Sequence, residues 1–401
     1  NNFKINGILF GDLIYDTNIR FFDRYVNPKV DIYFFKLLFV AIFRVNLINK
    51  YLDEYNIRYI NVGTQVYSFN SGICLRLGIY KNIKCFTPVG NDHGDFQIVD
   101  YKKNYIKYGP DNIKFSNLNV KFKNLKISNT KINKFYKDRK KLKIKNFYTR
   151  HDFKLANQGS MSAKKFIKKL RGIKTKKILY ASHALSDSAH ILGIKFSFND
   201  YYDQLQKTLS FIYNNDSSNT WVIRTHPASL LLNEYGKVED LISKYKKKNI
   251  LLCPKNVPLN KLYDQFELVV TGRGTIGLEF ACEGKNVLIA GNAPYSGFNI
   301  CNSAQNETQY FNYLKSINFK TKQSKEVVLL AKKILYFFES GIFLRNQLKI
   351  KDIRKDKVCS NFFIKNCGYG YREHDYLKLA EEFLSKNFKK SKTFNTLVNM
   401  L

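Results

Sequence analysis

The stretch ELVVTGRGTIGLEFACEGKNVLIAG, residues 267–291, has the pattern of a strand, a helix and a second strand in succession. Its two ends, 267–272 and 286–291, are short apolar runs rich in Val, Leu and Ile, which is typical of buried strands. Residues 275–284 between them predict a helix. Because two parallel strands need such a crossover, the stretch predicts a βαβ unit in a parallel sheet.

The same alternation continues on both sides of this unit. Apolar runs predict earlier strands at 176–182, 219–225 and 249–254. A helix is predicted after each of them, at 200–214, 229–247 and 258–265. A less regular series precedes them, with a strand and then a polar loop within 5–17, strands at 58–63 and 81–89, and helices at 31–55 and 68–79. Further helices are predicted at 306–317, 324–340 and 372–387. Strands that alternate with helices imply parallel sheets with right-handed crossovers.

The length of the chain allows two such sheets. Its 401 residues exceed what one hydrophobic core usually organises, and 44% apolar with 25% charged residues is a globular composition. We therefore expect an α/β fold of two Rossmann-like domains facing a cleft, residues 1–160 and 161–320. A helical segment, 321–401, is expected to pack back on both domains.

The formal net charge of +35 raises the question of a nucleic-acid partner. Lysine is abundant together with Asn, Ile, Tyr and Phe, which indicates an A/T-rich coding sequence, and no RNA-recognition, zinc-finger or helix-turn-helix motif is present. We expect no nucleic-acid partner, and a non-catalytic polyanion binder stays as an alternative class. Basic runs at 137–145, 244–249 and 386–392 suit an anionic membrane surface or an acidic substrate.

Cysteine usage predicts that the chain lies in a reducing compartment. The seven cysteines show no CxxC spacing, which predicts reduced thiols and argues against a disulfide framework or a zinc cluster.

The most apolar window, residues 33–48, is interrupted by Lys36 and Arg44. It is also shorter than the roughly 20 apolar residues that a membrane span needs. We interpret it as a buried helix.

Clusters of polar residues follow five of the predicted strands. They are Asp12 with Asp16, Asn91 to Gly94 with Asp92, His183 to His190, Arg224 to Pro227, and Thr271 to Thr275. Ligands of open α/β sheets bind beyond the carboxyl ends of the strands, where all five clusters would lie. The sequence therefore predicts a site along this edge.

The segment TGRGT suits a phosphate. Gly272 and Gly274 would let the backbone approach a ligand beside Arg273, and Thr275 stands at the expected N-cap of the next helix. Free N–H groups at a helix start bind anions. Glu279, one turn later, could receive a ribose hydroxyl or pair with a lysine.

The segment RTHP follows another strand. Pro227 is expected to open the following helix at its first turn, which would hold His226 and the neighbouring Arg224 rigidly toward the cleft. A structural histidine at a strand end is the alternative.

In SHALSDSAH, Asp187 is flanked by His183 and His190. The carboxylate could act as nucleophile or base, and a protonated histidine could deliver a proton to a leaving group. Two histidines and an aspartate could also hold iron or zinc. Their spacing is not that of the usual helical metal motif, so no metal is expected.

The order of HALSDSAH, FNDYYDQL, WVIRTHP and TGRGTIGLEFACEGKNVLIAGNAPYSG resembles bacterial capsular and surface polysaccharide biosynthesis proteins. Among these it is similar to GT-B glycosyltransferases that use CMP-activated ulosonic acids, namely Kdo transferases and, more distantly, bacterial sialyltransferases. The resemblance covers about residues 176–300 well and the first 95 weakly.

The resemblance implies roles for individual residues. His226, Pro227 and Thr275 would hold the cytidine monophosphate, and Asp187 would match the aspartate that acts near the sugar. No residue clearly matches the acceptor-side carboxylate, so Asp12, Asp16 and Asp92 compete for that role. Glu279 also resembles the ribose-binding Glu of UDP-sugar GT-B enzymes.

We therefore expect a GT-B glycosyltransferase that moves an ulosonic acid from a CMP donor to a capsule or lipopolysaccharide acceptor. The N-terminal domain would face the acceptor and the second domain the nucleotide sugar. Catalysis is expected from Asp187, His226, His183, His190 and Asp12, without cofactor or metal. The enzyme would work in the cytoplasm, at the inner face of the cytoplasmic membrane. A UDP-sugar transferase or epimerase on the same fold is the alternative within enzymes.

Overall fold

The computed structural model describes residues 3–21, 30–61, 71–88, 96–98, 122, 126–143, 161–190, 196–229, 232–245, 247–316 and 323–339. The chain separates into two units, residues 1–87 with 98–344 and residues 88–97 with 345–401. The elements and contacts below belong to the first unit, apart from strand residues 88, 96 and 97. The predicted helix at 372–387 lies outside the described residues.

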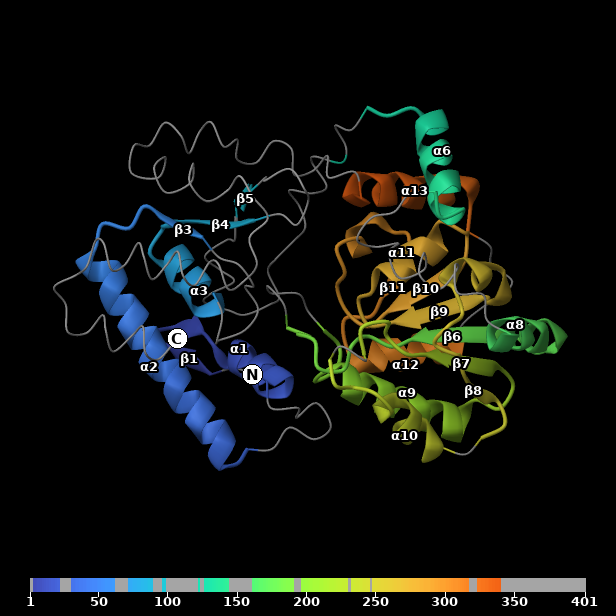
Figure 1. The fold of residues 1–401 in the computed structure, drawn as a ribbon, viewed down its shortest axis with the longest axis horizontal. Helices are drawn as coiled ribbons and strands as arrows, with labels where there is room; N and C mark the ends of the chain where they lie inside the picture. The colour runs from blue at the N-terminus through green and yellow to red at the C-terminus, as the bar shows by residue number, and fades with distance from the viewer. Residues whose placement is uncertain are drawn as a thin grey trace. The chain divides into compact units, whose positions relative to one another are not determined.

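A six-stranded parallel sheet organises the larger part of this unit (Figure 1). Its strands are β6 (Lys177–Ala181), β7 (Thr220–Arg224), β8 (Ile250–Leu252), β9 (Leu268–Thr271), β10 (Asn286–Ile289) and β11 (Asn302–Ser303). They lie in the order β11-β10-β9-β6-β7-β8, with every pair parallel. This is the Rossmann order, which reverses direction between β6 and β9, the point where such sheets bind ligands.

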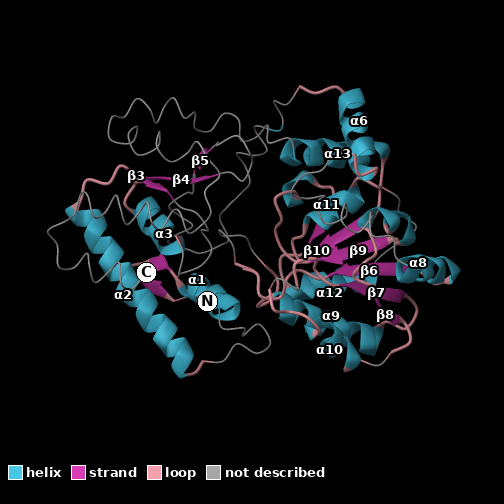
Figure 2. Ribbon diagram, in the orientation of Figure 1, coloured by secondary structure: helices cyan, strands magenta, loops and turns pink. Residues whose placement is uncertain are grey.

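Helices cover both faces of this sheet (Figure 2). On one face pack α6 (Asn129–Lys140), α8 (Met161–Gly172), α11 (Thr275–Ala281) and α13 (Lys325–Glu339). On the other pack α9 (Tyr201–Asn215), α10 (Lys237–Ser243) and α12 (Glu307–Ser316). Neighbouring residues of β6 alternate between the two cores, with Ile178 in one and Leu179 in the other, as the period of a strand requires. The short helices η3 (Leu259–Lys261), η4 (Tyr263–Gln265) and η5 (Ser296–Phe298) complete the connections.

A smaller sheet lies in the N-terminal part. Its strands are β3 (Tyr59–Asn61), β4 (Lys84–Pro88) and β5 (Phe96–Ile98), in that order, with β3 and β4 parallel. The helices here are α1 (Gly11–Phe21), α2 (Ile32–Glu54) and α3 (Gly72–Tyr80). The α/β class with parallel Rossmann-like strands is thus confirmed, while the predicted domain boundaries stay predictions.

The first predicted strand and loop are wrong in detail. Residues 5–17 form an antiparallel hairpin, β1 (Lys4–Ile5) with β2 (Ile8–Leu9), followed directly by α1. Asn6 and Gly7, at φ 51 and 77, make the two-residue turn that favours Asn-Gly. Asp12 and Asp16 therefore stand on a helix and not in a loop after a strand.

Helix α2 is not the buried helix that its apolar composition predicts. Only Leu37, Ala41 and Val45 are buried, in a core shared with α1 and α3. Among the described residues, α2 is the one helix that is long and apolar enough to cross a membrane by length and composition.

Two other predicted helices are shorter than expected. The helix predicted at 229–247 is reduced to α10, because Asn233 and Gly236 take positive φ and interrupt it. The one predicted at 258–265 forms η3 and η4 instead. Helix α6 lies in a region where the sequence showed no clear period.

Candidate active site at the carboxyl ends of the strands

The ends of the central strands are in register, which brings three predicted clusters to one edge of the sheet. Ala181 pairs with Arg224 on one side and with Thr271 on the other. Two further bonds join the strand ends: Thr271 Oγ1 donates to Ala181 O at 3.0 Å, and Ser182 N donates to Arg224 O at 2.9 Å. The residues that follow β6, β7 and β9 therefore emerge side by side at the switch point.

Three rings stack at this edge. His183 lies 4.1 Å from Tyr201 and 5.5 Å from His226 between ring centroids, with interplanar angles of 9° and 16°. The rings come from the loop after β6, the start of α9 and the loop after β7. The sequence placed both histidines here but not Tyr201, which sits within the quoted FNDYYDQL segment and carries no polar signal of its own.

A tight turn fixes the tautomer of His226. Ala228 N donates a hydrogen bond of 3.1 Å to His226 Nδ1. A neutral imidazole that accepts at Nδ1 carries its proton on Nε2, so Nε2 is the donor of this ring. Pro227 is part of that turn and does not open a helix, since α10 begins only at Lys237. The expected rigid hold on His226 thus comes from a turn.

His183 faces both a carboxylate and a guanidinium. Its Nδ1 lies 3.6 Å from Asp187 Oδ2 and has no hydrogen-bond partner among the described residues. Burial lowers the pKa of His183, and the positive charge of Arg273 lowers it further, although Asp187 opposes both effects. His183 is therefore a neutral ring in the folded protein at neutral pH.

Asp187 is the exposed carboxylate of the cluster. Its side chain is 39% exposed, and Oδ1 accepts a bond of 2.9 Å from Ser188 N. The backbone bond fixes one oxygen while the other lies toward His183. This arrangement leaves the carboxylate accessible from solvent beside the ring stack.

Arg273 reaches the same place from the loop after β9. Its Nη1 donates to Ala189 O at 3.2 Å, whereas Nε is buried and has no hydrogen-bond partner among the described residues. A buried donor without a partner is costly, which makes Arg273 a candidate for binding an anion.

Close packing against Tyr201 explains why residue 272 is a glycine. A Cβ at this position would lie 2.7 Å from Cε1 of Tyr201. The space expected for a ligand is thus taken by the ring that stacks on His183. Gly274 and not Thr275 is the N-cap of α11, and Thr275 is the exposed first residue of that helix.

Glu279 is engaged in an internal network. Its carboxylate accepts from Arg139 Nη2 at 2.8 Å and from Tyr263 OH at 2.9 Å, and Arg139 also bonds Glu339 at 2.7 Å. Of the two alternatives for Glu279, pairing with a cation is what the structure shows, although the cation is an arginine from α6 and not a lysine.

Arg224 also turns inward. Its Nη1 donates to Val257 O at 2.8 Å, and the residue is buried. The guanidinium thereby holds the loop after β8 against β7. The predicted role of Arg224 in a nucleotide site stays a prediction.

The second histidine of the segment SHALSDSAH, residues 182–190, belongs to a different pair. His190 Nδ1 lies 2.8 Å from Asp16 Oδ1, and Ser188 Oγ donates to the other oxygen of Asp16. Burial lowers the pKa of His190, but Asp16 together with Asp12 and Asp200 outweighs burial, so that the pKa is raised. Asp187 thus has only His183 as its histidine neighbour, while His190 and Ser188 join residues 182–190 to α1.

The acidic candidates of the N-terminal part have partners. Asp12 is buried and accepts from both terminal nitrogens of Arg76, at 2.6 and 2.8 Å. Asp16 is occupied by His190 and Ser188, as described above. Asp92 lies outside the described residues. The geometry favours structural roles for Asp12 and Asp16.

Two further carboxylates, neither of them a predicted site residue, shape the site. Glu234 accepts from both N and Oγ of Ser186 at 2.7 Å, and burial raises its pKa. Asp200 caps α9 and accepts from Tyr15 OH at 2.6 Å. Glu234 thus holds residues 182–190 in place, and Asp200 holds the start of α9. Among the described residues, no group of three metal-ligating side chains could hold a metal ion.

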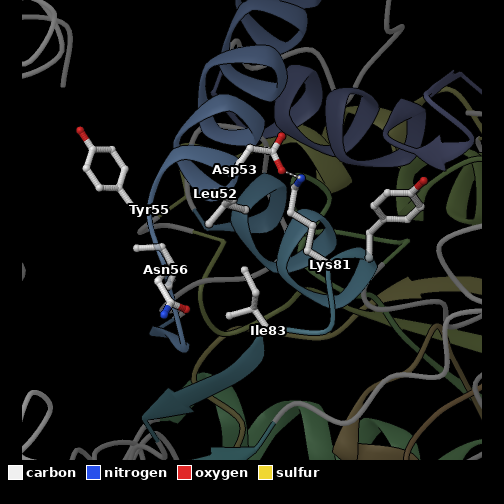
Figure 3. Close-up of a pocket in the computed structure, with 8 residues that line it drawn as sticks. Leu52, Asp53, Tyr55, Asn56, Lys81 and Ile83 are labelled. Atoms are coloured by element: carbon white, nitrogen blue, oxygen red, sulfur yellow. Dashed lines mark hydrogen bonds and ion pairs between the residues drawn. The ribbon is translucent and has the colours of Figure 1, made fainter.

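A hollow of about 620 Å³ lies elsewhere, at the carboxyl-terminal ends of α2 and α3. Asp53 and Lys81 point toward each other across it and form an ion pair (Figure 3). Its other lining residues are Leu52, Tyr55, Asn56, Ile57, Tyr80 and Ile83. None of the predicted site residues lines it.

Several solved structures resemble this chain in fold. One is the β-Kdo 2,7-transferase of KpsC from Thermosulfurimonas dismutans, 12% identical, with a TM-score of 0.38 over 72% of this chain and 80% of that one. Another is the UDP-GlcNAc 2-epimerase from Neisseria meningitidis bound to UDP-GlcNAc, 15% identical, with a TM-score of 0.33 over 74% and 79%. At these scores the likeness carries no assignment of activity.

Sequence families give a firmer result. No curated protein matches the chain. The sequence model of a family described as capsule polysaccharide biosynthesis protein matches residues 114–337, which is more than half of the 401 residues and contains the six-stranded sheet with its ring stack. The chain belongs to the family of capsule polysaccharide biosynthesis proteins.

Proposed function

We propose that this chain is a glycosyltransferase that transfers an ulosonic acid, Kdo-like or sialic-acid-like, from a CMP-activated donor to a capsule or lipopolysaccharide acceptor. Family membership supports a role in capsule synthesis. The main support for a nucleotide-sugar site is that His183, His226 and Arg273 lie together at the switch point of a sheet with the Rossmann strand order.

The donor phosphate would bind between Arg273 and His226. Arg273 offers a buried Nε–H, and the proton of His226 stands on Nε2 because Nδ1 accepts from Ala228. Both groups are donors, and one of them is charged, which is what a phosphate monoanion requires. The neutral His183, stacked between Tyr201 and His226, would hold the ring of His226 in place.

The transfer step would use Asp187. The bond between the anomeric carbon and the phosphate oxygen breaks, and CMP leaves with the electron pair. The acceptor hydroxyl oxygen forms the new bond to the anomeric carbon, and its proton passes to the departing phosphate. Asp187 would stabilise the positive charge at the anomeric carbon or form a transient bond to it. CMP is already a good leaving group, so this chemistry does not require a metal or a cofactor.

The UDP-sugar alternative depended partly on Glu279. The hydrogen bonds of that carboxylate with Arg139 and Tyr263 favour a structural role for Glu279. We therefore propose CMP as the donor nucleotide. The polyanion-binding alternative finds no specific support in the geometry. We further propose that the enzyme works in the cytoplasm at the membrane, where surface-glycan acceptors are assembled.

Calorimetry with CMP and UDP tests the proposal. We expect CMP to bind more tightly than UDP, and Arg273→Gln to weaken CMP by about tenfold or more, since a charged hydrogen bond is lost. Lys176→Gln is the matched control, because it removes an exposed cation at the opposite end of β6 and should change CMP affinity by less than about twofold. Tighter UDP binding would refute the nucleotide, and equal effects of both substitutions would refute the site.

A further inference from the structure

Helix α2 presents an apolar stripe that the rest of the described structure leaves uncovered. The stripe consists of Ile32, Phe35, Phe39 and Phe43, which are 63, 56, 71 and 47% exposed. Their spacing of three, four and four residues places them on one face of the helix. Val30 and Tyr33, also exposed, extend the apolar surface at its amino-terminal end.

The opposite face anchors the helix to the protein. Leu37, Ala41 and Val45 are buried in the core that contains Phe10 of the N-terminal segment and Ile73 of α3. Figure 1 shows α2 lying along α3. The buried face thus fixes the direction of the outward stripe, which no other part of the described chain covers.

The charges on α2 have one sign over most of its length. From residue 32 to residue 52 the charged side chains are Lys36, Arg44 and Lys50, and the acids Asp53 and Glu54 come only at the end. Lys36 is exposed and lies one turn from Ile32, at the border of the stripe. An apolar face with aromatic side chains and bordering cations is typical of helices that lie in a membrane interface.

We propose that the stripe of Ile32, Phe35, Phe39 and Phe43 docks onto an anionic lipid bilayer, with α2 lying in the plane of the interface. The net charge of +35 attracts the chain to anionic lipid and repels a second copy of it, which favours the bilayer over self-association. A membrane span would pull Leu37, Ala41 and Val45 out of the core they share with α1 and α3. This inference does not depend on the donor nucleotide or on the active site.

Vesicle cosedimentation of the full chain tests the docking. We expect binding to vesicles of phosphatidylcholine with phosphatidylglycerol, and weaker binding to phosphatidylcholine alone. The double variant Phe39→Ser/Phe43→Ser should lower the partition coefficient by about tenfold or more, because two phenyl rings no longer leave water. Lys36→Gln should lower it by about threefold to fivefold on anionic vesicles only.

A matched control removes two exposed apolar side chains elsewhere. Met161→Ser/Tyr235→Ser changes residues that are as exposed as those of the stripe, on α8 and before α10. It should leave vesicle binding unchanged, and circular dichroism should show that all variants are folded. Absence of binding by the unaltered chain, or equal loss in both double variants, overturns the proposal. So does sedimentation showing a dimer that Phe39→Ser/Phe43→Ser converts to a monomer.

Depth measurements distinguish lying in the interface from spanning. Phe43 stands in the middle of α2, so a spanning helix would place it near the centre of a hydrocarbon core about 30 Å thick. In Phe43→Trp, a docked helix gives stronger quenching by lipids brominated near the headgroup than by lipids brominated near the chain end. Stronger quenching near the chain end would overturn the in-plane orientation. Trp221, the one native tryptophan, is buried and provides the constant background.

Discussion

The imidazole rings of His183 and His226 lie nearly parallel, 5.5 Å apart, although they belong to loops that follow two different strands. Tyr201 continues the stack on the other side of His183. The three rings and the turn at Ala228 together orient Nε2 of His226. Substitution of any ring of the stack should therefore change the binding of the donor.

His226→Ala is expected to weaken both CMP binding and transfer. The substitution removes a donor to a charged phosphate, worth about 2 kcal/mol, which corresponds to roughly thirtyfold in affinity. His226→Gln keeps an N–H donor at similar reach and should recover part of the loss. Calorimetry and a transfer assay measure the two effects. Unchanged CMP affinity in His226→Ala would remove this residue from the phosphate site.

Asp187→Ala should separate binding from chemistry. Because Asp187 is proposed to act at the sugar, turnover should fall by about a hundredfold or more while CMP affinity stays within about threefold. The measurements are a single-turnover assay and calorimetry on the same preparation. Near-normal turnover in the variant would contradict the assignment and redirect attention to Asp92.

Gly272 and Tyr201 should be coupled in a double-mutant cycle. The Cβ of Gly272→Ala would lie 2.7 Å from the ring of Tyr201, so the ring must move at a cost of about 2 kcal/mol. In a Tyr201→Ala background the added methyl group meets no ring and should cost little. Urea unfolding of the four proteins gives the coupling energy. Additive effects would show that the two residues are not in contact.

The sequence predicted the second sheet well because its strands are short, apolar and bounded by glycine and polar residues. The strand ends at Ala181, Arg224 and Thr271 could be placed from pattern alone, and their register then follows from the parallel order. The direction of a side chain at a strand end, or on the helix that follows it, could not be predicted. Arg224 and Glu279 turn into the protein toward partners from loops and helices far along the chain, and no local pattern encodes those partners.

The N-terminal part was harder to predict for a different reason. An apolar helix can be apolar because it is buried or because it meets a membrane or another partner, and composition does not separate the two. Helix α2 is the case in point, with one narrow buried stripe and a wider exposed one. Asn6-Gly7 did carry a hairpin signal, but the strands on either side are only two residues long.

Glu279→Gln should affect stability and not nucleotide binding. The carboxylate shares Arg139 with Glu339, so its loss leaves the guanidinium partly paired and should cost about 2 kcal/mol of unfolding free energy. CMP affinity should be unchanged. Glu283→Gln, which removes a neighbouring carboxylate bonded to Lys140, is the matched control. A selective loss of CMP affinity in Glu279→Gln would restore the ribose-binding role.

Asp16→Asn should destabilise the protein in a pH-dependent way. The pKa of His190 is raised in the folded protein because Asp16, with smaller contributions from Asp12 and Asp200, outweighs the effect of burial. A raised pKa means that the ion pair stabilises the fold fully below the ordinary histidine pKa of about 6.5, and that this contribution is lost as the pH rises through the raised value.

The cost of Asp16→Asn should accordingly be about 3 kcal/mol near pH 6 and smaller near pH 9, because raising the pH removes the proton from His190 and with it the ion pair. The pKa of His183 is lowered, so its effect on stability has the opposite pH dependence. This effect is the same in the unaltered protein and in Asp16→Asn, and it cancels when their unfolding free energies are subtracted. Urea unfolding at the two pH values measures the cost. A cost that is constant, or that grows with pH, would show that His190 carries no charge in the folded protein. Its bond to Asp16 would then be that of a neutral imidazole N–H to a carboxylate.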